Sequence, residues 1–322
     1  MIYLNKQDIE KIGISWSKCV DIIYEAVVCH YKLDTVQPIK PYLRFKNQKN
    51  RIIAMPAYIG GKFNIAGIKW IASFPDNIQK NIPRASSVLI LNNSDTGQIE
   101  SVINTNLLSI IRTTSVSALV IKYFLDTRKK NNLIVGIIGL GPIGLYHTRM
   151  CQELYGEKIS KFILYDIKSI NKEVLNEIPQ EKISIAENWI EAYGESDIVI
   201  TCTVSKERYI DQKPKPGSLL LNVSLRDYKS DIFEFVKDSI IVDEWEEVCR
   251  ENTDIEIFHK ERNLQKEQTK SINDIVIHNS IDSYAENIPI MFNPMGMAIF
   301  DIAIAKYYLE LAKNKEIGLS LS

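Results

Sequence analysis

Cysteine and histidine are scarce in this chain of 322 residues, which has five cysteines and four histidines. No two cysteines have the Cys-x-x-Cys spacing of a zinc or redox motif, and the histidines are scattered. The sequence therefore predicts no metal site. An odd number of cysteines without motif spacing is typical of reduced, buried thiols in a cytoplasmic protein. An excess of positive or negative charge is also lacking, because the net charge is −1. Neither nucleic acid nor a membrane is therefore an expected partner.

Long apolar runs are missing as well. None approaches the ~20 residues of a membrane span, and residues 1–6 lack the basic and then apolar pattern of a secretory signal. An apolar content of 45% with 25% charged residues is typical of a globular protein. The length allows two domains of ordinary size. These features predict a soluble, cytoplasmic, two-domain protein.

The strongest motif is Gly-Leu-Gly-Pro-Ile-Gly at 139–144, which follows the apolar run 134–138 and precedes a helix-like segment. This order of strand, glycine turn and helix is the context that a dinucleotide-binding fingerprint requires. Gly139 would allow the tight turn, Gly141 would let the backbone approach a pyrophosphate, and Gly144 would let helix and strand pack closely. Pro142 is tolerated in a first helical turn. The exposed amides near Ile143 would face the phosphates.

A second strand, 161–165, ends in Asp166, roughly 20 residues beyond the glycines. A carboxylate at this place accepts hydrogen bonds from a ribose diol and repels a 2′-phosphate. The pair of signals therefore predicts NAD rather than NADP as the cofactor. The alternative is a glycine-rich turn without a ligand, followed by a strand that happens to end in an acid.

The residues before the glycine motif have the pattern of a mainly antiparallel sheet with flanking helices. Helical spacing of apolar residues predicts a helix at 17–33, and an apolar stretch predicts a longer one at 107–125. The segment 127–132 is expected to be a solvated linker. Strands are expected at 2–4, 51–58, 63–73, 86–92 and 98–104.

Lys69 stands in the middle of the apolar strand 65–72, where alternation makes both faces look buried. A buried ammonium group needs an anion beside it, since burying the charge alone costs several kcal/mol. We interpret the anion as a ligand carboxylate. An internal carboxylate is the alternative.

The middle of the second helix, 112–118, is a cluster of small residues around Arg112. Small side chains at Thr113 and its neighbours would let a cofactor or another element approach the backbone. The guanidinium of Arg112 suits a carboxylate or a phosphate. A salt bridge on the helix surface is the alternative for Arg112.

Beyond Asp166 the chain alternates apolar strands and helices, which predicts a parallel sheet covered on both faces. Ligands of such sheets bind beyond the carboxyl ends of the strands. Thr201, Thr203 and Asp227 fall at those ends, so Asp227 is expected near the nicotinamide; a solvated loop aspartate is the alternative. The turn at Met295 and Gly296 offers amides to a ligand, or is only a connection. Strands are expected at 183–186, 197–203, 216–223 and 239–243, and helices at 142–155, 187–193 and 298–313.

Together these stretches resemble the ornithine cyclodeaminase/mu-crystallin family. The matching pieces are 51–56, the strand of Lys69, 111–117, the glycine turn, 222–227 and 296–299. The resemblance implies an α/β protein in which a Rossmann NAD-binding domain (116–294) is inserted in an α+β substrate-binding and dimerisation domain (1–115 plus 295–322). It also implies a homodimer acting on an amino acid.

Within this family the segments 36–44, 84–86 and 293–298 resemble a subgroup of dehydrogenases that serve siderophore synthesis. The resemblance implies NAD-dependent oxidation of N-(1-amino-1-carboxy-2-ethyl)-L-glutamate to 2,3-diaminopropionate and 2-oxoglutarate. By position, Arg44, Lys69 and Arg112 correspond to the residues that bind the substrate carboxylate, and Asp227 to the catalytic acid/base. Arg84 departs from the cyclodeaminases, and we expect it to bind an additional carboxylate.

Two questions stay open at this stage. The first is whether Asp227, or Lys69 with a lowered pKa, serves as the general base. The second is the role of Lys229, because the loop after Asp227 departs there from the family pattern. The alternative functions are an NAD-dependent cyclodeaminase, an amino-acid or imine dehydrogenase, or a dinucleotide-dependent binding protein.

Overall fold

The computed structural model describes residues 1–321; Ser322, the last residue of the expected substrate domain, lies outside the described part. The chain divides into two compact units. The first unit joins Met1–Ser115 to the segment that begins at Gly296, and the second unit is the continuous segment Val116–Met295. The division falls inside helix α3 (Leu107–Arg128).

The first unit is built on one eight-stranded sheet with the order β16-β1-β7-β6-β5-β4-β2, and β3 pairs with β4. Strands β4 to β7 are antiparallel neighbours, and β1 runs parallel to β7. The two chain ends meet in this sheet, since β1 and β16 are antiparallel partners. The strands are β1 (Ile2–Asn5), β2 (Thr35–Val36), β3 (Tyr42–Arg44), β4 (Arg51–Ile59), β5 (Ile65–Ser73), β6 (Ala85–Asn93), β7 (Ile99–Asn104) and β16 (Leu319–Ser320).

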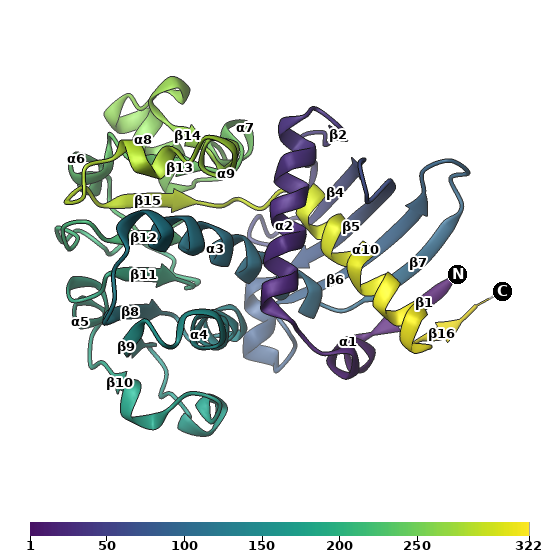
Figure 1. Ribbon diagram of the computed structural model, residues 1–322, viewed down its shortest axis with the longest axis horizontal. Helices are drawn as coiled ribbons and strands as arrows, with labels where there is room; N and C mark the ends of the chain where they lie inside the picture. Colours follow the sequence, from purple (N-terminus) through teal and green to yellow (C-terminus); the bar gives the residue numbers. More distant parts are fainter. Residues whose placement is uncertain (322) are drawn as a thin grey trace. The chain divides into compact units, whose positions relative to one another are not determined.

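Helices α2 (Trp16–Tyr31) and α10 (Ala298–Lys315) lie side by side, and α10 crosses β4, β5 and β6 (Figure 1). Residues 298–305 of α10 are all buried, so the helix is surrounded by protein on every side in its first two turns. The short helix α1 (Lys6–Ile12) begins with a capping box between Asn5 and Asp8 and packs against α10. A 3-10 helix, η1 (Pro75–Lys80), joins β5 to β6.

One expectation about β5 is wrong. Its two faces are not both buried: Ile65, Gly67 and Lys69 are buried on one face, but Trp70 on the other face is 38% exposed. The sheet therefore has one face that packs on α10 and one that is partly solvated, which is common in antiparallel sheets. Lys69 points to the buried face.

The second unit is a parallel sheet with the order β10-β9-β8-β11-β12-β15-β13-β14. The chain runs outward from β8 to β9 and β10, and then returns to β11 on the other side of β8. This is the order of a Rossmann fold, whose ligands bind where the direction reverses. The strands are β8 (Leu133–Ile138), β9 (Ile159–Tyr165), β10 (Ile183–Ile185), β11 (Ile198–Thr201), β12 (Leu219–Asn222), β13 (Ile240–Val242), β14 (Lys270–Ser271) and β15 (Ile290–Asn293).

The expected fold class is confirmed, because a Rossmann unit is inserted in an α+β unit. Strands β14 and β15 were not expected, and the expected linker at 127–132 begins inside α3. The helices of the second unit are α4 (Pro142–Tyr155), α5 (Trp189–Gly194), α6 (Phe233–Val236), α7 (Trp245–Val248), α8 (Asp254–Arg262) and α9 (Ile272–His278), with 3-10 turns η2 (Lys172–Leu175), η3 (Gln180–Lys182), η4 (Ser230–Ile232), η5 (Lys266–Gln268) and η6 (Ser280–Ser283).

Helix α3 corrects the expectation that no apolar stretch approaches the length of a membrane span. Its 22 residues are long and apolar enough to cross a membrane by length and composition, yet 72% of its most apolar window is buried inside the protein. It is therefore a core helix. Two of the small residues in the middle of α3 contact α4, since Tyr155 Oη donates to Ala118 O at 2.8 Å and His147 Nε2 lies 2.9 Å from Ser117 Oγ.

Candidate functional site

The glycine turn between β8 and α4 has the geometry that its sequence predicts. Gly139 has φ +93°, a value that disfavours any side chain, and its added Cβ would lie 2.8 Å from the carbonyl carbon of Cys202. An added Cβ at Gly144 would lie 2.0 Å from Gly139 O. The first and third glycines are thus required by the close approach of β8, β11 and α4.

Gly141 differs from the other two glycines, because an added Cβ there would meet nothing within 4 Å. The protein itself gives no reason for a missing side chain at this position, whereas a ligand held against the backbone would. Gly141 is exposed and is the N-cap of α4, whose first helical residue is Pro142, followed by the half-buried Ile143. The unbonded amides of this helix start suit a pyrophosphate.

Asp166 lies directly after β9 and faces the glycine turn. Its Oδ2 accepts a hydrogen bond from Leu140 N at 2.7 Å, and its Oδ1 accepts one from Lys168 N at 2.9 Å. The carboxylate is therefore fixed beside the turn, and each oxygen retains a lone pair for a ribose hydroxyl. Gly141 and Asp166 together fit a dinucleotide with a free ribose diol.

Asp227 follows β12 in the loop 223–228 and is 1% exposed. Thr203 Oγ1 donates to Asp227 Oδ1 at 2.5 Å, and Ser224 Oγ donates to Oδ2. Burial raises the pKa of Asp227, and the hydrogen bonds from Ser224 and Thr203 oppose that rise. The alternative of a solvated loop aspartate is therefore wrong.

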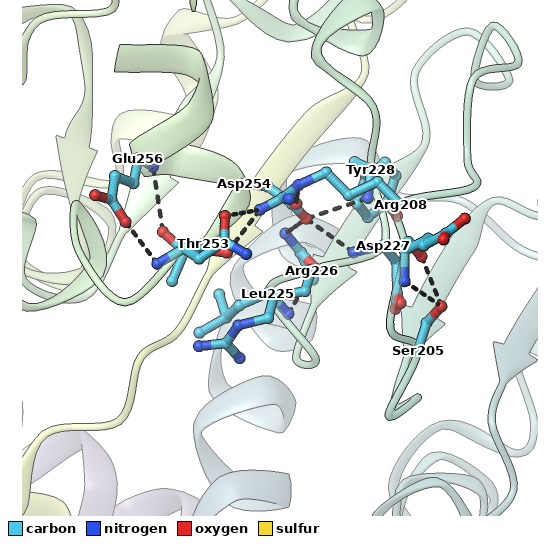
Figure 2. Close-up of polar contacts among 12 residues, drawn as sticks. Ser205, Arg208, Leu225, Arg226, Asp227, Tyr228, Thr253, Asp254 and Glu256 are labelled. Atoms are coloured by element: carbon cyan, nitrogen blue, oxygen red, sulfur yellow. Dashed lines mark hydrogen bonds and ion pairs between the residues drawn. The ribbon is translucent and has the colours of Figure 1, made fainter. Parts of the chain in front are cut away.

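A second buried carboxylate, Asp254, holds the Asp227 loop (Figure 2). Asp254 Oδ2 accepts hydrogen bonds from the backbone amides of Asp227 at 3.1 Å and Tyr228 at 3.2 Å. Its Oδ1 accepts one from Arg208 Nε at 2.6 Å. Since Leu225 has φ +63° and its carbonyl accepts from Asp254 N, the loop is fixed from both sides.

Replacing Asp254 with asparagine is expected to lower the free energy of unfolding by about 1–3 kcal/mol, because buried donors lose a charged acceptor. Urea unfolding followed by circular dichroism measures this change. The matched control is Glu261→Gln, at an exposed position near the end of α8. Equal midpoints for Asp254→Asn and the wild type would contradict the assigned role.

Thr201, expected to bind cofactor, is fully buried. Its Oγ1 lies 3.4 Å from Asn222 Oδ1 and 3.0 Å from Ser224 Oγ. Its hydroxyl is therefore part of the network under the Asp227 loop. Thr203, at the same strand end, is only half-buried and directly contacts Asp227.

In the first unit, Lys69 and Arg112 share one carboxylate, that of Asp301 in α10. Lys69 Nζ lies 2.8 Å from Asp301 Oδ2, and Arg112 Nε lies 2.9 Å from Asp301 Oδ1. All three residues are at most 6% exposed. The anion beside Lys69 is thus internal, which corrects our preferred interpretation of a ligand carboxylate as its partner. Arg112 forms a buried ion pair, so the surface salt bridge is also wrong.

The charges in this cluster do not cancel, since two cations face one carboxylate. The pKa of Lys69 is lowered to about 8, mainly by burial; the nearby charges of Arg112 and Lys40 also lower it, while Asp301 raises it. Burial alone would raise the pKa of Asp301, but Arg112 and Lys69 outweigh burial and lower it. Among residues 1–321, the terminal nitrogens of Arg112 donate no hydrogen bond to a protein acceptor.

Gly296 lies against this cluster. It has φ +88°, and an added Cβ would lie 2.7 Å from Arg112 Nη1. Its carbonyl accepts a hydrogen bond from Lys40 Nζ at 2.7 Å. Met295, on the other side of the division, donates its amide to Asp243 Oδ1 at 3.0 Å. A cofactor contact at Met295 or Gly296 stays a prediction.

The other residues that the sequence analysis named make contacts of their own. Arg44, at the end of β3, donates to Gln48 O at 3.2 Å, and Arg84 directly precedes β6. Thr113 Oγ1 donates to Ser109 O within α3 at 2.8 Å, and its cofactor contact stays a prediction. Lys229 forms a surface ion pair with Asp211 at 2.6 Å. The structure thus joins Lys69 to Arg112, and Thr203 to Asp227.

The residues that the sequence did not single out are Lys40, Asp254 and Asp301. Asp301 is the only charged residue within the apolar run 298–305, and a charge in such a run indicates a buried ion pair. Lys40 stands between two prolines, 3% exposed, with no comparable signal. Asp254 lies in a charge-rich stretch that hides it.

The family model of the ornithine cyclodeaminase/mu-crystallin family matches residues 3–316. The chain belongs to this family. The membership predicted from the sequence is thereby confirmed. As a family member, the chain is 35% identical to the N-((2S)-2-amino-2-carboxyethyl)-L-glutamate dehydrogenase of Staphylococcus aureus, over 100% of this chain and 98% of that protein.

Two further comparisons give lower identities. The alanine dehydrogenase of Archaeoglobus fulgidus is 24% identical over 98% of this chain and 97% of its own. A solved structure of the Delta(1)-pyrroline-2-carboxylate reductase of Thermococcus litoralis, in complex with NADH and L-proline, has a TM-score of 0.87. It is 24% identical, and the match covers 100% of each chain.

Proposed function

We propose that this protein is an NAD-dependent dehydrogenase that oxidises N-((2S)-2-amino-2-carboxyethyl)-L-glutamate and releases L-2,3-diaminopropionate and 2-oxoglutarate. Identity of 35% to the dehydrogenase of Staphylococcus aureus, over the whole chain, supports this substrate. The structural observation that carries the proposal is the buried cluster of Lys69, Arg112 and Asp301, whose excess positive charge suits a substrate carboxylate.

Arg112 gives this proposal its geometry. Its Nε is occupied by Asp301, while its terminal nitrogens have no acceptor among residues 1–321. A carboxylate bound there would accept two charge-assisted hydrogen bonds and balance the excess charge. Asp301 orients both cations for this purpose, and Arg44 is proposed to bind a further part of the substrate.

The second unit is proposed to bind NAD. The helix start at Pro142 would bind the pyrophosphate and Asp166 the ribose diol. When bound, NAD supplies a hydride acceptor. Gly141 leaves the backbone accessible to the phosphates, and the carboxylate of Asp166 disfavours a 2′-phosphate.

Asp227 is proposed as the general base. The secondary amine of the substrate must be neutral before the adjacent Cα–H bond breaks, and a carboxylate can take its proton. Lys69 is less suited, because a neutral amine there would forfeit the ion pair with Asp301. The hydride leaves the glutamate carbon, an imine forms, and water adds to it. The C–N bond then breaks to give the amine and the 2-oxo acid.

The test is to incubate the protein with NAD and the glutamate adduct and to follow NADH and 2-oxoglutarate together. Equal amounts of both products are expected, with little turnover when NADP replaces NAD. A cyclodeaminase would return its hydride, so it would accumulate no NADH, and a binding protein would give a stability shift without turnover. Either result would overturn the proposal.

The pH dependence of kcat/KM is expected to have an alkaline limb near pH 8. Lys69 is charged below its pKa of about 8 and neutral above it, so its attraction for a substrate carboxylate is lost as the pH rises. In Lys69→Arg the guanidinium stays charged, and the limb should move to a higher pH. Profiles of both proteins, each normalised to its own maximum, measure this. An unchanged limb would remove Lys69 from carboxylate binding.

The first unit is proposed as the substrate-binding and dimerisation domain, and the whole protein as a cytoplasmic homodimer. The product 2,3-diaminopropionate would serve as a precursor in siderophore or peptide-antibiotic synthesis. Size-exclusion chromatography with light scattering tests the dimer directly.

A further inference from the structure

Three arginines meet at one end of the sheet in the first unit. Arg44 in β3 pairs with Arg51 in β4, Arg51 pairs with Ser73 in β5, and Ser73 pairs with Ala85 in β6. Arg84 directly precedes Ala85, and its carbonyl accepts from Phe74 N at 2.8 Å. The strand register therefore brings these three charges together from distant parts of the sequence.

Two of these arginines have unused donors. The Nε atoms of Arg51 and Arg84 are buried, and each lacks a hydrogen-bond partner within residues 1–321. Burial lowers the pKa of Arg84, and the charge of Arg51 lowers it further. No carboxylate of the described chain contributes to that balance. Buried donors and neighbouring like charges are costly unless an anion joins them.

Neighbouring side chains contact the three arginines or lie beside them. The guanidinium carbons of Arg44 and Arg51 lie 5.2 and 5.8 Å from the ring centroid of Tyr42, so one aromatic ring contacts both cations. Asn106 Nδ2 donates to Ala85 O at 2.5 Å, beside Arg84, while its Oδ1 is buried without a protein donor. Polar side chains at this sheet end thus retain capacity for a ligand and its water.

Arg51 and Lys69 belong to the same face of the sheet. Ser73 is four residues beyond Lys69 in β5, so alternation places both on one face, and Arg51 is the ladder partner of Ser73. Four residues along a strand span about 13 Å. The long side chains of lysine and arginine shorten the distance between their charges. This spacing suits the two ends of an extended, multiply charged substrate.

We propose that Arg51 and Arg84 form a second carboxylate subsite, which binds the side-chain carboxylate of the glutamate moiety. The proposal rests on the proposed function and adds Arg51 as a specificity-determining residue. A substrate without the distal carboxylate would leave the buried Nε donors of both arginines unpaired. The subsite therefore selects adducts of dicarboxylic amino acids over adducts of neutral ones.

The test compares the glutamate adduct with the corresponding glutamine adduct, in which an amide replaces the distal carboxylate. In Arg51→Gln, kcat/KM for the glutamate adduct is expected to fall about 10- to 100-fold, as for a lost charged hydrogen bond, mainly through KM. Turnover of the glutamine adduct should change less than about threefold. Arg84→Gln should have the same effects on both adducts as Arg51→Gln. Arg51→Lys should restore part of the preference, and its melting curve reports on folding.

The matched control is Lys46→Gln, which removes one exposed charge from the loop after β3 and should leave the preference intact. Calorimetric titration with L-glutamate and L-glutamine, in the presence of NAD, gives a reading that needs no turnover. Glutamate preference in the wild type that is lost in Arg51→Gln supports the subsite even if the proposed reaction is absent. An equal effect of Arg51→Gln on both ligands, or none on either, overturns it.

Discussion

Replacing Asp227 with asparagine is expected to lower kcat by about 10²- to 10⁴-fold, the usual contribution of a general acid or base. Asparagine keeps the hydrogen bond from Thr203 to Oδ1 and the shape of the side chain, but it cannot take a proton. The loss should therefore appear in kcat, while KM for the substrate changes little. Steady-state rates of NADH formation measure both constants.

The acid limb of the pH profile gives an independent reading. Burial raises the pKa of Asp227, so the wild type should lose activity at a higher pH than an ordinary aspartate would cause. The base is active only when deprotonated, and the rate falls as the pH drops through that raised pKa. Asp211→Asn, at a partly exposed aspartate of the same unit, is the control and should keep both limbs. Full turnover by Asp227→Asn would remove Asp227 from the proposed chemistry.

The second large effect is expected at Asp301. Asp301→Asn removes the carboxylate that Lys69 and Arg112 share, and it leaves two buried cations without that compensation. Breaking a buried ion pair from one side costs about 3–5 kcal/mol. Urea unfolding followed by circular dichroism is expected to show a loss of this size. Glu310→Gln, at an exposed position of α10, is the control and should cost about 0.5 kcal/mol or less.

A double variant separates lost charge balance from poor packing. In the Asp301→Asn background, Lys69→Met removes one of the two uncompensated cations, so it should cost less than in the wild type or even restore stability. Strictly additive losses in the double variant would contradict the shared ion pair. The same variants should bind substrate weakly, because Arg112 loses the carboxylate that orients it.

The glycine turn and Asp166 could be predicted from sequence because their contacts are local. Strand, turn and helix follow one another without interruption, and the acid that bonds Leu140 N lies only 26 residues away. The steric roles of Gly139 and Gly144 also follow from the motif alone. The open side of Gly141 is consistent with the same fingerprint.

The partner of Lys69 could not be predicted in the same way. Alternation in β5 indicates that Lys69 is buried and needs an anion, but Asp301 is 232 residues away in sequence. Which of two anions fills the need depends on tertiary packing of α10. The interpretation that a ligand carboxylate pairs with Lys69 was therefore wrong, because Asp301 is its partner. The excess positive charge of Lys69 and Arg112 still favours a second anion.

Asp254 shows a different limit. The stretch 251–274 looks like a surface segment because it is charge-rich, yet Asp254 is fully buried and Ile255 and Phe258 are in the core. Strand β15 was missed because its short apolar run lies between Pro289 and Pro294, which favour turns. Short parallel strands are stabilised by neighbours on both sides rather than by their own pattern.

The divided first unit also sets an order for events on the ribosome. Its Lys69 and Arg112 are synthesised early, but Asp301 follows Lys69 by 232 residues, a delay of about 10–50 s at ordinary rates of elongation. The continuous unit Val116–Met295 has all its strands before α10 emerges. We therefore expect the second unit to fold first on the nascent chain. Until α10 packs on the sheet, Lys69 and Arg112 lack Asp301 and are expected to stay hydrated.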